Sequence, residues 1–160
     1  MQVEHTYPIA PRALFDVLVD PAFLQARAAR FGGAGEPRVE HADGVVVVTT
    51  PRQLPIERVP GSARRLVGDG RVEQVDRWER IGDEQVSGEW STVVGHAPIT
   101  MRGTHEIVPA GETGSAYTVT ITVDVHVPVI GGRLSREVEG HLEELVRTEQ
   151  QFTAEWVAQH

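Results

Sequence analysis

The sequence predicts an α+β fold in which an antiparallel sheet of six to seven strands curves around one long C-terminal helix. Residues 116–127 alternate strictly between apolar and polar side chains, as in a strand with one face in the core and the other in water. Residues 134–157 instead carry apolar side chains at helical spacings. Short turns join the strand-like segments between the two ends of the chain, which favours antiparallel pairing. Only the terminal helix is long and apolar enough to fill the concave face of such a sheet.

The composition indicates a single soluble domain, residues 1–160, and excludes several kinds of chemistry. A chain of 160 residues of which 40% are hydrophobic suits one packed domain. It contains no cysteine, which excludes disulfides, thiolate catalysis and cysteine-ligated zinc or iron–sulfur sites. It also contains no lysine, so a Schiff-base mechanism has no nucleophile. We expect no cofactor.

Charge and hydropathy limit the partners of the chain. The formal net charge of −8 would repel a nucleic-acid backbone, and the only dense basic pairing is Arg64-Arg65. The N-terminal residues do not follow the pattern of a signal peptide. No run approaches the ~18 consecutive apolar residues of a membrane span. We therefore expect a cytoplasmic protein that does not bind nucleic acid and has no membrane span.

A strand and two short helices are expected at the N-terminal end. In the strand, residues 2–7, His5 shares a face with apolar neighbours. Pro11 suits the first position of one helix, and Pro21 suits that of the next, with Asp20 as its N-cap. Gly32-Gly33 is expected to end the second helix. The expected core residues of the two helices are Leu14, Phe15, Val17, Leu18, Phe23, Leu24 and Phe31.

The middle of the chain predicts the rest of the sheet. Residues 38–41 and 45–50 predict a hairpin that turns at Asp43-Gly44. Residues 51–70 hold three prolines and three glycines, and they predict a long connection with a short helix at residues 62–67. A connection of this length is often functional, so we expect a lid or portal there. Further strands are expected at residues 71–81, 85–94 and 99–108, with turns at residues 82–83, 95–98 and 109–114.

Two sequence motifs, one near each end of the chain, indicate a resemblance to a known family. The run Pro11-Arg12-Ala13-Leu14-Phe15, followed by Asp20-Pro21, comes after the first strand. Residues 128–132 lead into the terminal helix, which carries Glu149-Gln150-Gln151-Phe152 and Trp156. With this order of elements, the whole chain resembles the START and birch-pollen-allergen superfamily, also called the SRPBCC group. It is most similar to an uncharacterised-domain branch that is common in GC-rich bacteria.

The resemblance implies a helix-grip fold with a cavity between the sheet and the helix. It does not imply one ligand, because lipid carriers, hormone receptors, cyclases and co-chaperones share this fold. The inner face of the sheet is expected to mix aromatic, methionine and glycine residues, which suits an apolar pocket. The same residues could simply pack against the helix as core. Those expected to bind a ligand are Trp78, Trp90, Met101, His105, Val138, His141, Leu142, Leu145 and Glu149.

His105 and Glu149 are the candidates for catalysis. Glu149 lies on the apolar stripe of the helix, where an unpaired carboxylate costs several kcal/mol. It should therefore reach an inward partner such as His5, His105 or Tyr7, or else lie at the rim of the cavity. A buried pair could act as a general acid–base couple or hold the polar group of a ligand. The alternative is a structural ion pair.

No metal site is expected. The chain has seven histidines, but none has the His-x-x-x-His or His-Glu-x-x-His spacing of a metal site. His96, His126 and His160 are expected in a turn, on the outer face and in the tail.

The sequence leads to three hypotheses about function. The first is the binding of a hydrophobic small molecule or lipid in the cavity, with residues 51–70 controlling access. The second is a cyclase- or hydrolase-like enzyme that uses His105 and Glu149 on a hydrophobic substrate. The third is an interaction protein whose core is filled.

Overall fold

The computed structural model describes residues 1–59, 61–94 and 97–160, so Pro60 of the predicted connection and the predicted turn position of His96 lie outside the described residues. The sheet runs in the order β1-β7-β6-β5-β4-β3-β2, with β8 also paired to β6, and the paired strands are antiparallel. The strands are β1 (Gln2–Tyr7), β2 (Arg38–Ala42), β3 (Val45–Gln53), β4 (Arg71–Ile81), β5 (Val86–Val93), β6 (Ile99–Ala110), β7 (Gly114–Thr120) and β8 (Thr122–Val125).

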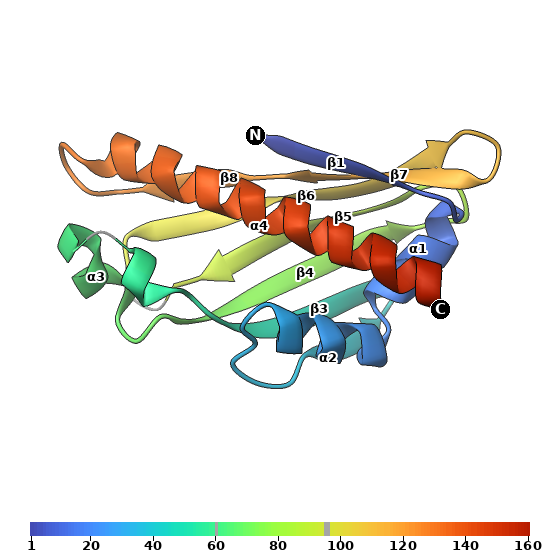
Figure 1. Ribbon diagram of the computed structural model, residues 1–160, viewed down its shortest axis with the longest axis horizontal. Helices are drawn as coiled ribbons and strands as arrows, with labels where there is room; N and C mark the ends of the chain where they lie inside the picture. The colour runs from blue at the N-terminus through green and yellow to red at the C-terminus, as the bar shows by residue number, and fades with distance from the viewer. Residues whose placement is uncertain (60, 95–96) are drawn as a thin grey trace.

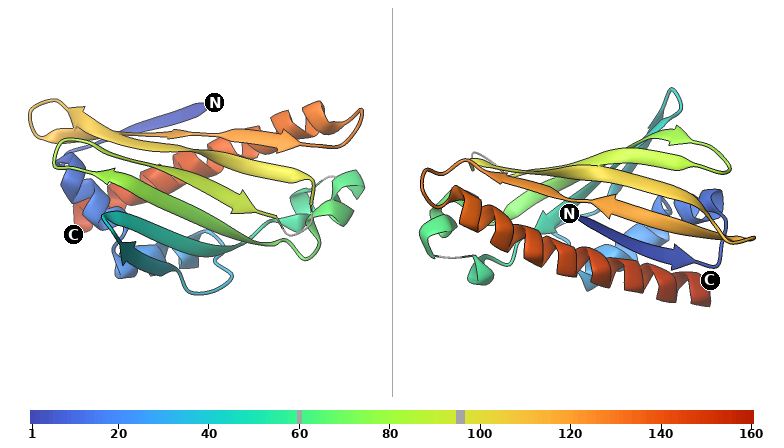
Figure 2. Two further views of the ribbon diagram at one scale, coloured as in Figure 1. Left: turned by 180° about the vertical axis from the view of Figure 1, so that it is seen from behind. Right: turned by 90° about the horizontal axis from the view of Figure 1, so that it is seen from above.

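The helices lie on one face of this sheet (Figure 1, Figure 2). The long helix α4 (Gly131–Gln159) crosses that face, and α1 (Pro11–Leu18) and α2 (Pro21–Arg30) lie beside its C-terminal half. The short helices η1 (Ile56–Arg58) and α3 (Gly61–Val67) lie at the end of the sheet where α4 begins. The predicted helix-grip architecture is confirmed.

Local interactions explain where these elements begin and turn. The Asp20 carboxylate accepts hydrogen bonds from the Ala22 and Phe23 N–H groups at 2.8 and 3.1 Å, which satisfies donors that the first turn of α2 leaves free. Asp43 and Gly44 both have positive φ, 52° and 76°, as a two-residue hairpin turn requires. The predictions of an N-cap and of a hairpin are confirmed at these positions.

Strand β3 continues through Pro51 to Gln53, whereas the sequence predicted a connection from residue 51 onward. Pro51 still pairs with Glu73 of β4 because its missing N–H belongs to the other edge of the strand, beyond the end of β2. On that edge the Pro51 carbonyl accepts a hydrogen bond from the Ala34 N–H at 3.1 Å. Arg52 therefore remains in the register of the sheet, on the face that carries buried Thr50.

The last predicted strand is divided at Ile121 into β7 and β8. The Thr120 carbonyl accepts a hydrogen bond from the indole N–H of Trp90 at 2.9 Å, and Gly103 of β6 lies directly against this carbonyl. The predicted alternation nevertheless continues across the break. Its inward-facing members are all buried: Tyr117, Val119, Ile121, Val123 and Val125.

We predict that Gly103→Ala destabilises the fold by about 2 kcal/mol, because the new methyl group would overlap the Thr120 carbonyl and the Trp90 indole. The matched control is Gly140→Ala on the exposed face of α4, where nothing lies within 4 Å of the added carbon. That change should raise stability by up to about 1 kcal/mol through helix propensity. Urea unfolding of both variants measures the effects, and equal stabilities would contradict this account of the break in the strand.

Candidate functional site

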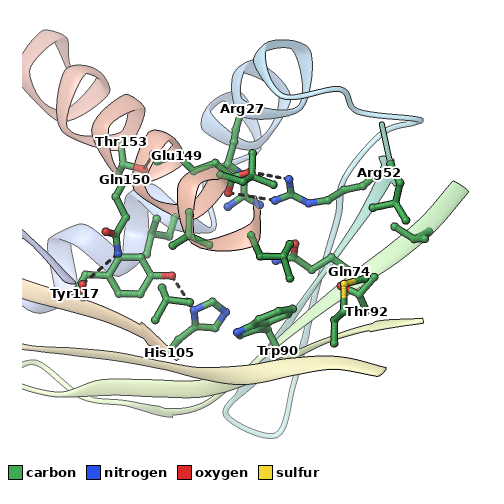
Figure 3. A pocket seen from close by; sticks show the side chains of 18 residues that line it. Arg27, Arg52, Gln74, Trp90, Thr92, His105, Tyr117, Glu149, Gln150 and Thr153 are labelled. Atoms are coloured by element: carbon green, nitrogen blue, oxygen red, sulfur yellow. Dashed lines mark hydrogen bonds and ion pairs between the residues drawn. The ribbon is translucent and has the colours of Figure 1, made fainter. Parts of the chain in front are cut away.

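A cavity of about 90 Å³ lies between the inner face of the sheet and α4 (Figure 3). Strands β3 to β7, residues 142–153 of α4, single residues of α1 and α2, and Leu54 after β3 contribute to its wall. The residues that line it are Leu18, Arg27, Arg52, Leu54, Val72, Gln74, Trp90, Thr92, Met101, His105, Tyr117, Val119, Leu142, Leu145, Val146, Glu149, Gln150 and Thr153. The wall is mainly apolar, with its charged groups on one side.

Six of the nine sequence-predicted ligand-binding residues line this cavity: Trp90, Met101, His105, Leu142, Leu145 and Glu149. Trp78 lies behind His105, buried, with the two rings stacked at a centroid distance of 4.7 Å. Val138 packs half-buried against the core, nearer the start of α4. His141 is exposed, and its Nδ1 lies 2.9 Å from the Glu137 carbonyl. The structure therefore does not bring these last three to the cavity wall.

Glu149 forms a bidentate ion pair with Arg52. The Arg52 guanidinium donates to the two carboxylate oxygens at 2.6 and 3.2 Å, and both side chains are almost buried, with 13% and 14% exposed. Burial raises the pKa of Glu149, but the positive charges of Arg52 and Arg27 and the hydrogen bonds outweigh burial and hold the pKa below its ordinary value of 4.5. Glu149 is therefore a carboxylate at neutral pH.

The partners proposed for Glu149 from the sequence were wrong. Tyr7 donates its hydroxyl hydrogen to the Gln150 carbonyl at 3.1 Å, and the His5 ring lies against Tyr7 at 4.9 Å. Arg52 was missed because Pro51 was interpreted as the end of a strand. The signal was present, since Arg52 continues the period-two pattern of the inward residues Val46, Val48 and Thr50.

His105 is held between Asp76 and Tyr117. Its Nε2 lies 2.7 Å from an Asp76 carboxylate oxygen, and its Nδ1 lies 2.8 Å from the Tyr117 hydroxyl. All three side chains are buried, and the Gln74 amide donates to both Asp76 oxygens at 2.9 and 3.1 Å. In the tautomer that this geometry favours, Nε2–H donates to Asp76 and Nδ1 accepts from Tyr117.

The environment sets the charges of this network. Burial raises the pKa of Asp76, but the hydrogen bond and the electrostatic interaction with His105, with smaller contributions from Arg27 and Gln74, lower it below the ordinary value of 3.8. Burial, with the negative charge of Asp76, raises the pKa of Tyr117 well above its ordinary value of 10.0. At neutral pH, the site therefore holds an Asp76 carboxylate and a neutral Tyr117 phenol.

Arg27 also lines the cavity, and sequence reasoning did not select it. It follows Phe23 by four residues and Leu24 by three, so it shares the buried face of α2. That spacing was the available signal.

Residues 2–157 match the family described as "Protein of unknown function (DUF2505)". An uncharacterized protein of Mycobacterium tuberculosis is 31% identical over 117 residues, which are 72% of this chain and 67% of that protein. The chain belongs to the DUF2505 family.

Several solved structures have a fold similar to that of this chain. Human STARD10 superposes with a TM-score of 0.64 at 10% identity, covering 99% of this chain and 63% of that chain. Norcoclaurine synthase from Thalictrum flavum, in complex with dopamine and hydroxybenzaldehyde, superposes with a TM-score of 0.60 at 12% identity, covering 100% and 86%. These likenesses confirm the predicted helix-grip fold. Within the described ranges, no helix of the chain has the length and apolar character needed to cross a membrane.

We predict that Glu149→Gln destabilises the fold by about 3 kcal/mol at pH 7, because it leaves the Arg52 guanidinium almost buried without its counter-charge. The control is Glu143→Gln on the same helix, which breaks the more exposed pair with Arg147 and should cost less than about 0.5 kcal/mol. Urea unfolding measures both.

The same pair also predicts a pH dependence. Because the pKa of Glu149 is lower in the folded protein, its stabilisation is fully present above its ordinary value of 4.5 and is lost as the pH falls through the folded value. The stability difference between the wild type and Glu149→Gln should therefore shrink on acidification below pH 4.5. A difference that stays constant down to the acid transition would contradict the assignment of a stabilised carboxylate.

Proposed function

We propose that this chain binds a small, mainly apolar molecule in the cavity between the sheet and α4. The observation that carries the proposal is the composition of the wall, in which Trp90, Met101, Leu142 and Leu145 surround a hollow that also presents charged and hydroxyl groups on one side. Binding sites for small molecules combine an apolar lining with a few polar groups in this way. Norcoclaurine synthase, which shares the fold, is described in complex with dopamine and hydroxybenzaldehyde.

The predicted portal at residues 51–70 is part of this proposal. Its described part contributes Leu54 to the cavity wall, next to Arg52 at the end of β3. Leu54 is held by a hydrogen bond from its N–H to the Gly70 carbonyl at 2.8 Å, which joins the two ends of the connection. We propose that a ligand passes this segment, between β3 and α4, on its way to the cavity.

We predict that Leu142→Trp lowers the affinity for a lipophilic fluorescent dye such as N-phenyl-1-naphthylamine at least about tenfold, because the larger ring fills the hollow. Glu144→Trp is the matched control, since it places the same side chain on the exposed face of the same helix and should leave dye affinity unchanged. Fluorescence titration measures both variants.

Native mass spectrometry of the purified wild type complements the titration by detecting an apolar molecule that co-purifies. Wild-type protein that carries no such molecule and does not bind the dye would sink the binding proposal. The filled-core hypothesis would then remain.

A second candidate function is proton-transfer catalysis, and the chain Asp76–His105–Tyr117 favours it. Asp76 orients His105, and His105 accepts the hydrogen of the Tyr117 hydroxyl, so the phenol oxygen could take a proton from a bound substrate while its own proton moves to Nδ1. This arrangement replaces the couple of His105 and Glu149 suggested by the sequence, because Glu149 is occupied by Arg52.

We predict that the wild type accelerates the ring opening of nitrobenzisoxazole, in which a base removes the C–H proton, the N–O bond breaks and its electrons remain on the phenolate oxygen. Tyr117→Phe and His105→Gln should each lower kcat/KM at least about tenfold, as expected for loss of general-base catalysis. His126→Gln removes an exposed histidine and should leave the rate unchanged. The phenolate absorbance measures the rate, and equal rates for all four proteins would rule the relay out.

A further inference from the structure

The charged groups of the cavity wall do not balance. Two arginines and one glutamate line it: Arg27 from α2, Arg52 from β3 and Glu149 from α4 (Figure 3). Glu149 engages Arg52 through both of its oxygens. Arg27 has no hydrogen bond or ion pair with any side chain in the described ranges. The residues that line the wall thus include one more positive than negative group, and a further negative charge, the buried Asp76 carboxylate, interacts with Arg27 without a hydrogen bond.

Polar atoms without partners gather at the same place. Among the described residues, the Nε–H of Arg52 and the hydroxyl of Thr50 are buried and have no hydrogen-bond partner. Both residues lie with Arg27 around a second, narrower hollow between α2 and β3. A buried donor without an acceptor is destabilising, so this corner is short of acceptor atoms.

The position of Arg27 in α2 explains why a positive residue is favourable there, but not why its side chain lies at the cavity. It lies in the last turn of the helix, where a positive charge interacts favourably with the helix dipole, and its guanidinium is 5.9 Å from the centre of the Phe23 ring. Arg30 lies in the same turn, with its guanidinium 5.7 Å from the centre of the Phe31 ring, and it is exposed. Its positive charge therefore already interacts favourably with the helix dipole from the protein surface. Arg27 instead lies at the cavity, where its planar group can bind a carboxylate through two hydrogen bonds.

We propose that the cavity takes a small amphiphilic carboxylic acid whose apolar body lies against Trp90, Met101 and Leu142 and whose carboxylate binds Arg27. This inference rests on the proposed binding function and names the class of its ligand. The carboxylate supplies an acceptor for the Arg27 guanidinium, which has none among the described side chains. Glu149 is already engaged by Arg52 through both of its oxygens, and Asp76, which also interacts electrostatically with Arg27, does not line the wall.

Magnitudes favour a ligand with such an anchor. The gain from burying apolar surface scales with the area buried, and for a ligand small enough for a hollow of about 90 Å³ that gain is largely offset by the loss of translational and rotational freedom on association. Apolar contact in a hollow of this size therefore supports only weak binding. A charge-assisted hydrogen bond to Arg27 adds enough binding free energy for the site to favour a carboxylic acid over an uncharged analogue.

The test compares octanoate with octan-1-ol, which share a chain and differ in charge, by isothermal titration calorimetry at pH 7. The wild type should bind octanoate about tenfold more tightly than octanol. Arg27→Gln should remove this preference by weakening octanoate about tenfold while leaving octanol unchanged. Arg27→Lys should restore part of the preference, because it keeps the charge and loses the planar fork.

Arg30→Gln is the matched control, since it removes an arginine from the same turn of α2 that does not line the cavity, and it should change neither affinity. Circular dichroism confirms that each variant is folded. Equal binding of acid and alcohol by the wild type, or equal weakening of both by Arg27→Gln, would overturn the assignment of the carboxylate while leaving the cavity function intact. Failure of both compounds to bind the wild type would overturn the binding function itself, and the inference with it.

Discussion

The orientation of α4 depends on the ion pair between Arg52 and Glu149. Two charges that are almost buried must meet each other, because either one alone would cost several kcal/mol. Their contact fixes the rotation of α4, since turning Glu149 toward the sheet also turns Leu142, Leu145 and Gln150 inward and Glu144 outward. The ion pair also connects the helix to the C-terminal end of β3 beside the cavity. At this point a polar pair bridges the sheet and the helix beside the cavity.

The inner face of the sheet carries more buried polarity than packing requires. Asp76, His105 and Tyr117 form a satisfied network under the cavity, and Trp78 stacks on His105 behind it. Replacing such a network with well-packed apolar residues is often neutral or stabilising, so its presence is weak evidence for a role in stability. Under the functions proposed above, this network offers a bound molecule a phenol oxygen that is held in position by a histidine and a carboxylate.

The fold could be predicted from the sequence, and the site only in part. The alternation assigned to residues 85–94 and 99–108 and the helical stripe of residues 134–157 each specify an element and its inward face, so Trp90, Met101, His105 and Leu142 were placed on the faces that line the cavity. Partners across the fold could not be found in this way, because periodicity says which face a side chain occupies but not which strand faces which turn of a helix. Pro51 added an error of its own, since a proline can remain in a strand when its missing N–H falls on an unpaired edge.

Specificity in such a cavity must come from its few polar groups. An apolar wall separates ligands that differ by one methylene group by only about 1–3 kcal/mol, whereas a site built to hydrogen-bond one group rejects an analogue that lacks it far more strongly. Members of a fold shared at 10–12% identity can keep the hollow and still differ in what they hold. Among the described residues that face the hollow, Arg27 and the Tyr117 oxygen are two groups with unused hydrogen-bonding capacity, whereas the Arg52 terminal nitrogens and the Glu149 oxygens engage each other. Under the proposed binding function, the ligand is therefore selected by what can meet a guanidinium at one side of the cavity and a phenol at its floor.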